Sequence, residues 1–308
     1  MNISKQERTD KMGKLIKGVS KNARFFICDT KDMVQEAMDI HSCSPTGISI
    51  LGRVLTAAGM MGTDLKSEND SMTIRINGDG PAGTIIATAN MKGEVKGYMN
   101  NPQVETEDHD STHIHIGKAV GNGTMYVIKD MGLRDPFSGL VQLQTGEIGD
   151  DLAYYFYTSE QIPSVVALGV KINKDYKVSC AGGFIIQLLP GAENEFIDRL
   201  EEKLKAIRPV TELFEGGFDI YRIARLLYED MGSDEEGKLV EDYEILAESE
   251  ITYKCDCSRE RYLRGLITLG RKEIDSILEE DGGKMEVECH FCMKKYEFTK
   301  EDFEDIEF

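Results

Sequence analysis

Four of the seven cysteines stand in two close pairs near the end of the 308-residue sequence. Cys255 and Cys257 form a Cys-x-Cys motif, and after 31 intervening residues Cys289 and Cys292 form a Cys-x-x-Cys motif. Thiolates are favoured zinc ligands, and a close pair lets one turn of backbone supply two corners of a tetrahedron. We therefore predict that these four cysteines bind one Zn²⁺. Because four thiolates fill the zinc coordination shell, we do not expect hydrolytic chemistry there.

A redox-active dithiol is the main alternative for the second pair. Such a Cys-x-x-Cys motif normally lies between a strand and a helix of a βαβ unit. Here it lies between residues 285–288 and 296–298, two short strand-like runs, which favours a hairpin knuckle. The remaining cysteines are scattered along the chain, and we expect them to be small buried apolar side chains: Cys28, Cys43 and Cys180.

The elements around the two pairs are predicted to be short. Ser258 follows the first pair and can cap a helix that ends before Gly270. Residues 271–280 predict a second helix, which leads into the hairpin that carries the second pair. Residues 251–308 are too few for a substantial core, so we expect a metal to hold them together. Removing the metal or oxidising its ligands should therefore unfold much of this segment.

Residues 1–190 show several short strand patterns with few intervening helices, which is typical of an α+β fold with antiparallel sheets. The longest helix pattern covers residues 46–65, with its apolar side chains roughly on one side. We predict an N-terminal core domain (1–190) with antiparallel sheets and packed helices, a helical linker (191–250) and a small four-cysteine zinc domain (251–308). The expected strands are 71–76, 84–89, 94–99, 124–129, 140–144, 165–172 and 177–189, with a short helix at 149–159.

Two amphipathic helices are predicted in the linker, and the linker is strongly acidic. It carries seven basic and 18 acidic residues, a net charge of −11 out of −19 for the whole chain. Self-repulsion of this size weakens a compact state, so we expect a docked but marginally stable segment. A pair of ordinary surface helices is the alternative. The apolar residues on the two helical faces are Phe196, Leu200, Leu204, Ile220, Ile223 and Leu227.

The overall charge limits the choice of partners. With 36 basic and 55 acidic residues, the surface repels nucleic-acid phosphates and anionic lipids. The sequence contains no apolar run near the roughly 18 residues that a membrane span needs. The polar N-terminal segment also lacks the apolar region of a secretory signal. We therefore expect a cytoplasmic protein whose partners are neither nucleic acids nor membranes.

Three histidines in an acidic stretch form a weaker metal-site candidate: His109, His113 and His115. His113 and His115 would share one face of a strand. A solvated loop with incidental histidines is the alternative that we favour. His290 lies inside the second cysteine pair, and we expect it to be a bystander because the tetrahedral shell is already full.

The sequence resembles the redox-regulated, thirty-three-kilodalton heat-shock chaperones of bacteria over nearly its whole length. The most specific segment is 253–261, Tyr-Lys-Cys-Asp-Cys-Ser-Arg-Glu-Arg, followed by the second cysteine pair. Residues 146–156, 159–164 and 181–187 also look like the core of that family. One position departs from the family pattern, because Met293 stands where a glycine is usual. A left-handed turn at this residue would cost about 1 kcal/mol more than with glycine.

The resemblance implies an ATP-independent holdase, not an enzyme. In the reduced, inactive state, the four cysteines would bind one zinc ion as thiolates. Oxidation would form the disulfides Cys255–Cys257 and Cys289–Cys292, release the zinc, and unfold the zinc domain and the linker. The exposed apolar surface would then bind unfolded client proteins, and the active form would be a homodimer. The six apolar linker residues named above, and the sheet of the first domain, are our candidates for client binding.

A constitutive zinc ribbon that recruits a protein partner is the alternative function. The same four ligands would serve it, and the acidic charge does not argue against a protein partner. Redox dependence separates the two functions. Oxidation would abolish the function of a structural ribbon, whereas it would activate a holdase.

Overall fold

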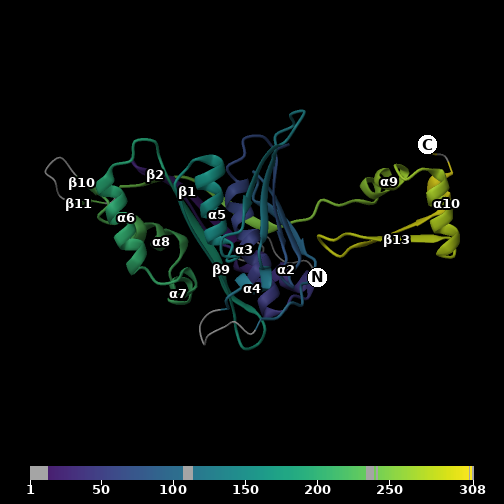
Figure 1. Ribbon diagram of the computed structural model, residues 1–308, viewed down its shortest axis with the longest axis horizontal. Coiled ribbons are helices and arrows are strands. Elements are labelled where there is room, and N and C mark those ends of the chain that lie inside the picture. Colours follow the sequence, from purple (N-terminus) through teal and green to yellow (C-terminus); the bar gives the residue numbers. More distant parts are fainter. Residues whose placement is uncertain (1–12, 107–113, 234–238, 241, 305, 307–308) are drawn as a thin grey trace, which may run out of the picture. The chain divides into compact units, whose positions relative to one another are not determined.

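A ten-stranded sheet organises the first 253 residues (Figure 1). The computed structural model describes residues 13–106, 114–233, 239–240, 242–304 and 306. The strand order is β7-β6-β3-β4-β5-β12-β1-β2-β9-β8, and all neighbours are antiparallel except β12 and β5. The strands are β1 (Gly13–Val19), β2 (Ala23–Asp29), β3 (Ser71–Gly78), β4 (Thr84–Asn90), β5 (Glu94–Met99), β6 (Gly123–Asp130), β7 (Phe137–Gln142), β8 (Ser164–Ile172), β9 (Val178–Leu188) and β12 (Glu244–Tyr253).

The long helix α3 (Pro45–Gly62) is buried on every side. Its start is fixed by Ser44, whose hydroxyl accepts a hydrogen bond from the N–H of Gly47 at 2.9 Å. Every residue from Thr46 to Gly62 is buried, because α3 contacts strands from both halves of the sheet. Gly59 permits one of these contacts, since a Cβ there would lie 2.1 Å from Cδ1 of Ile251. The sequence pattern predicts a helix with apolar side chains on one side only. In the structure, the helix is surrounded by other elements and buried on all sides.

Four shorter helical elements complete this side of the fold. They are α2 (Lys31–His41), α4 (Gly117–Val120), α5 (Gly149–Tyr155) and the π-helical turn η1 (Phe156–Glu160). Helix α2 packs on α3 and on β9, and α5 packs on β8. Within the described residues, no helix has both the length and the apolar character needed to cross a bilayer.

Three helices cover the opposite face of the sheet: α6 (Asn194–Ala206), α7 (Val210–Glu215) and α8 (Ile220–Tyr228). In Figure 1 they lie together beside β2 and β9, away from α3. Successive side chains of a strand point to opposite faces of the sheet, so one strand can contribute side chains to two different cores. On β2, Phe26 and Cys28 belong to the core around α3, whereas Phe25 and Ile27 belong to the core under α6–α8.

The linker contains more than the two predicted helices. It also holds the short strands β10 (Gly232–Ser233) and β11 (Leu239–Val240), and most of β12. Strand β12 pairs with β1 from Gly13↔Ile251 to Val19↔Glu244, near the middle of the sheet. Most of its side chains are at least partly exposed, so backbone pairing rather than an apolar pattern holds it. This explains why the sequence pattern does not reveal β12. Strands β1 and β2 and helix α2 are also absent from the predicted elements.

The chain separates into two compact units, residues 1–253 and residues 254–308, which we call the body and the C-terminal module. The module contains α9 (Arg259–Ile267), α10 (Arg271–Glu280), β13 (Lys284–Glu288), β14 (Lys295–Thr299) and the 3₁₀ helix η2 (Lys300–Phe303). The α+β fold class, the two module helices and the hairpin are as predicted. The division into three domains proposed from the sequence remains a prediction.

The core of the module is small. Ile274 and Leu278 of α10 pack against the hairpin, and Phe303 of η2 closes the cluster. Three hairpin side chains complete the six buried members that this cluster has within the described part of the module: Met285, Tyr296 and Phe298. A core of this size is well below what usually stabilises an independent domain.

Candidate metal centre

The two cysteine pairs lie on two different elements of the C-terminal module. Cys255 and Cys257 lie in the segment that leads from residue 254 into α9, and Ser258 caps that helix by accepting a hydrogen bond from the N–H of Arg261. Cys289 and Cys292 lie in the turn of the β13–β14 hairpin. The hairpin therefore brings the second pair to the start of α9, although the pairs are far apart in sequence.

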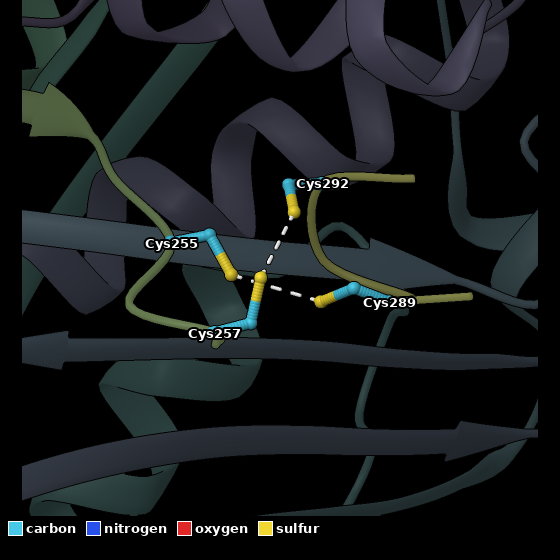
Figure 2. Close-up of side chains that lie close together, drawn as sticks. All are labelled: Cys255, Cys257, Cys289 and Cys292. Atoms are coloured by element: carbon cyan, nitrogen blue, oxygen red, sulfur yellow. Dashed lines mark hydrogen bonds between the residues drawn. The ribbon is translucent and has the colours of Figure 1, made fainter. Parts of the chain in front are cut away.

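The four sulfur atoms point toward one another, as Figure 2 shows. The Sγ atoms of Cys255 and Cys289 are 3.7 Å apart, and those of Cys257 and Cys292 are 3.4 Å apart. All four lie within 4.8 Å of one another, and none is in a disulfide. A tetrahedral zinc site with Zn–S bonds of about 2.3 Å separates its sulfurs by about 3.8 Å. The donor set and its spacing thus fit one four-thiolate metal ion, as predicted for zinc.

The hairpin turn has the shape of a metal-binding knuckle. The N–H groups of Cys292 and Met293 donate to the carbonyl of Cys289 at 3.2 Å and 2.7 Å, and the N–H of Cys289 donates to the carbonyl of Lys294 at 2.9 Å. Met293 has φ +57°, in the left-handed region. The left-handed turn considered for this position is therefore present, and it is occupied by a residue with a Cβ.

The residues between and after the first cysteine pair position the site. Asp256 forms an ion pair with Arg261 at 2.9 Å. Arg259 donates to Asp302 at 2.7 Å and to the carbonyl of Glu297 at 2.9 Å, which ties the start of α9 to β14 and η2. The Arg259 guanidinium also holds the pKa of the Asp302 carboxyl below its usual value. The charged residues of the Cys-x-Cys-Ser-Arg-Glu-Arg motif thus fasten the two ligand-bearing elements together.

Two tyrosines lie beside the sulfurs, and no local sequence pattern predicts the position of either one. The hydroxyl of Tyr296 lies 3.1 Å from Sγ of Cys257 and 3.2 Å from the carbonyl oxygen of Cys257. Tyr262 packs on the ring of Tyr296 with centroids 5.1 Å apart, and it acts to lower the pKa of the Cys289 thiol. Tyr296 comes four residues after Cys292, but only the strand register shows that its side chain turns back to the other pair.

The cysteines differ in acidity according to their surroundings. Burial raises the pKa of Cys289, but hydrogen bonds from Tyr262 and from the N–H groups of Phe291 and Cys292 bring it to about 7. Burial raises the pKa of Cys255 and, less strongly, that of Cys292. A bound divalent cation would favour the thiolate form of all four.

The scattered cysteines are buried, as expected. Burial raises the pKa of Cys43 to about 12 and that of Cys180 to about 11, and it raises the pKa of Cys28 further. These thiols are therefore protonated and poorly nucleophilic near neutral pH.

The histidines do not form a second site within the described residues. His109 and His113 lie outside those residues. His115 is exposed at the start of α4 and belongs to no described cluster of three or more metal-binding side chains. His290 is exposed, and the described metal-binding cluster in the module consists of the four cysteines.

The six candidate client-binding residues lie in the core under α6–α8. Five of them are buried and Leu204 is half-buried. They pack against the apolar face formed by Phe25 and Ile27 of β2 and Phe184 of β9. Their role in binding clients remains a prediction, and it requires this core to open.

Comparison with known proteins extends these observations to the whole chain. Residues 13–299 match the family described as Hsp33 protein. The 33 kDa chaperonin of Bacillus pumilus is 43% identical over 284 residues, which cover 92% of this chain and 93% of that protein. The 33 kDa chaperonin of Caldanaerobacter subterraneus is 44% identical over 286 residues, covering 92% and 94%.

A solved structure agrees with the sequence relatives. The crystal structure of the 33 kDa chaperonin (Hsp33 homologue) from Thermotoga maritima matches with a TM-score of 0.82 and 33% sequence identity. The match covers 96% of each chain. The family resemblance seen in the sequence motifs is therefore confirmed: the chain belongs to the Hsp33 family of chaperones.

Proposed function

We propose that this chain is a redox-regulated, ATP-independent holdase of the cytoplasm, inactive when reduced and zinc-bound and active when oxidised. One observation carries the proposal. Four thiol sulfurs lie within 4.8 Å of one another in a module whose apolar core, among the described residues, has six buried side chains. A unit with so small a core depends on its cross-links, so chemistry at the sulfurs can control whether it stays folded.

In the proposed reduced state, Cys255, Cys257, Cys289 and Cys292 hold the zinc ion as thiolates. The ion would neutralise part of their charge and link α9 to the hairpin. Arg259 and Asp302 support the same connection through their ion pair of 2.7 Å. The module is then folded and the linker stays docked.

In the proposed oxidised state, each close pair forms a disulfide, Cys255–Cys257 and Cys289–Cys292. Two thiolates lose two electrons as the S–S bond forms. One molecule of hydrogen peroxide accepts the two electrons and, with two protons, becomes two molecules of water. The two disulfides together remove all four ligands from the site, so the module loses its main cross-link.

The surface exposed on activation would come from the core under α6–α8. Helix α6 has thirteen residues but only two buried ones, Phe196 and Leu200, and its other residues are partly or fully exposed. The linker's net charge of −11 adds repulsion that opposes docking. Undocking would expose the apolar faces of α6–α8 and of strands β2 and β9 to unfolded client proteins.

The remaining parts of the proposal concern partners. We propose a homodimer as the active form, unfolded proteins as clients, and neither nucleic acids nor membranes as partners. The net charge of −19 supports the exclusion of nucleic acids and anionic lipids.

Light scattering from a chemically unfolded client, diluted into buffer without ATP, tests the proposal. Reduced, zinc-loaded protein is compared with protein treated with peroxide under mild warming. We expect only the oxidised sample to suppress aggregation. A Cys289→Ser variant should bypass the oxidant, because it lacks one zinc ligand. Suppression by neither wild-type sample would contradict the holdase function and favour a constitutive zinc ribbon that recruits a protein partner.

A further inference from the structure

The side chain of Tyr228 carries a hydroxyl group that is buried without a hydrogen-bond partner. Tyr228 is the last residue of α8 and is fully buried. Within the described residues, two buried side-chain nitrogen or oxygen atoms lack a partner, the hydroxyl oxygen of Tyr228 and Nε of Arg53. Arg53 still donates through another nitrogen to the Glu147 carboxylate, at 2.7 Å. Tyr228 thus differs from Arg53 in making no side-chain hydrogen bond at all.

Two other tyrosines of the body are also buried, and both have partners. The hydroxyl of Tyr155 donates to the Glu160 carboxylate at 2.8 Å. The hydroxyl of Tyr253 donates to the carbonyl of Gly97 at 2.7 Å. The fold therefore satisfies a buried tyrosine hydroxyl at these two positions and leaves the one under α8 unsatisfied.

Aromatic rings surround the ring of Tyr228. Its centroid lies 4.8 Å from that of Phe25 on β2, 6.4 Å from that of Phe196 on α6 and 5.6 Å from that of Tyr243, just before β12. These contacts join the linker to the sheet in the core under α6–α8. A phenylalanine ring would make the same ring contacts, so the hydroxyl adds a desolvation cost without adding a bond.

This cost applies only while the linker is docked. A hydroxyl buried without a partner has lost its hydrogen bonds to water and gained none in return. When α6–α8 leave the sheet, the hydroxyl returns to water and the cost disappears. The hydroxyl therefore raises the free energy of the docked state relative to the undocked state. The linker's net charge of −11 acts in the same direction.

We propose that the unpartnered hydroxyl of Tyr228 is a built-in destabilising element that sets how readily α6–α8 undock from the sheet. The inference rests on the proposed function and deepens it by naming a residue that tunes the opening. A switch responds to a local change only when its two states are close in free energy. The hydroxyl narrows this gap by an amount that corresponds to about a 10-fold change in the docking equilibrium.

Hydrogen exchange of the full-length, reduced, zinc-loaded protein measures this equilibrium. In Tyr228→Phe, peptides from residues 194–228 should exchange about 10-fold more slowly than in wild type, and peptides from α3 should be unchanged. Tyr155→Phe is the matched control, because it removes a buried hydroxyl that has a partner. It should lower the stability of the body and should not slow exchange in residues 194–228. Circular dichroism verifies that both variants fold.

A second substitution separates the hydroxyl from the ring. Tyr228→Leu also lacks the hydroxyl, but it leaves a cavity among the surrounding rings. We expect exchange in residues 194–228 to become faster than in wild type, opposite to the effect of Tyr228→Phe. Slower exchange in both variants would assign the effect to loss of the aromatic ring and would contradict the role of the hydroxyl.

Unchanged or faster exchange in Tyr228→Phe would overturn the proposal, because the hydroxyl would then not oppose docking. These measurements need neither oxidant nor client, so they test Tyr228 independently of the holdase function. In the aggregation assay, oxidised Tyr228→Phe should suppress aggregation less than wild type at the same peroxide dose. Failure of oxidised wild-type protein to suppress aggregation would contradict the holdase function and leave the exchange result standing.

Discussion

The body and the C-terminal module are stabilised by different means. In the body, α3 has 17 consecutive buried residues, and strands of one sheet pack on both of their faces. In the module, every residue of α9 is at least partly exposed, and the described core consists of six side chains. Apolar burial can hold the body together, whereas the module needs the link between its four sulfurs. The module is therefore the region that a change at a few atoms can unfold.

The two faces of the sheet repeat this contrast on a smaller scale. The face toward α3 is covered by a helix that is buried throughout, and the face toward α6–α8 is covered by short helices with charged outer surfaces. The second face is the one that local opening can expose at the lower cost in free energy. Four changes, from the largest expected effect to the smallest, test these differences.

Loss of one sulfur ligand should show most clearly that the module and the body are stabilised by different means. Cys289→Ser removes a ligand from a site that contributes about 10 kcal/mol or more to folding when zinc is bound. We expect peptides from 259–299 to lose nearly all protection in hydrogen exchange, while peptides from α3 and β4 keep theirs. Cys180→Ser, in the body, is the control and should change neither region. Retained protection in the module would show that its apolar core suffices.

A cavity under α8 should loosen one face of the sheet and not the other. Leu227 is fully buried, and Leu227→Ala should cost about 2–5 kcal/mol. Hydrogen exchange should accelerate in residues 194–228, and the reduced protein should begin to suppress client aggregation. Leu51→Ala makes the same change in α3, and we expect it to lower global stability without this selective opening. Equal acceleration on both faces would contradict the difference between them.

A glycine at the knuckle should strengthen the module slightly. Met293→Gly relieves the left-handed strain at φ +57°, which is worth about 1 kcal/mol, or roughly a fivefold gain in zinc affinity. Competition with a chelator of known affinity measures the change. Met293→Ala removes the same side chain but keeps a Cβ, so it should not show the gain. A gain in both variants would assign the effect to the methionine side chain instead.

A fall in pH should remove the destabilising effect of the Asp29 charge on the body. The same fall in pH should weaken metal binding in the module. Burial raises the pKa of Asp29 at the end of β2, although the N–H and charge of Lys31 oppose the change. A raised folded-state pKa means that Asp29 destabilises the body above that pKa, and that the penalty disappears as pH falls through it. The sulfur site instead weakens as pH falls, because protons compete with the metal for thiolates.

Asp29→Asn should therefore stabilise the body slightly at pH 7, with the advantage vanishing toward lower pH. Thermal unfolding of the body, measured from pH 7 to pH 4, checks this smallest effect. Asp175→Asn changes an exposed carboxyl in the β8–β9 turn and serves as the control. An advantage that grows as pH falls would show that the sign is wrong.

Local signals explain which parts of the structure could be predicted from the sequence. Ser258 as a cap, Gly270 as a helix break and the closely spaced cysteines act over a few residues, so α9, α10 and the hairpin were predicted nearly at their observed bounds. The left-handed turn at Met293 follows from the same local geometry. These features do not depend on how the rest of the chain folds.

The missed features all depend on contacts between distant residues. Strand β12 is acidic and mostly exposed, and it exists because β1 pairs with it. Helix α3 looks one-sided in sequence, but the sheet supplies partners on all its sides. The contact between Tyr296 and Cys257 joins residues 39 positions apart. Strand order and register create these contacts, and neither can be read from apolar periodicity.

The place of β12 in the sheet has a consequence for how the linker can move. Residues 189–243 are held at both ends by strands of one sheet, β9 and β12. When α6–α8 undock, they therefore form a tethered loop, not a free tail. A tether of this length keeps the helices near their docking face at an effective concentration on the order of millimolar, so re-docking is fast and independent of protein concentration. A protease that cuts the open loop once would leave β12, and the module that follows it, attached to the body through the sheet.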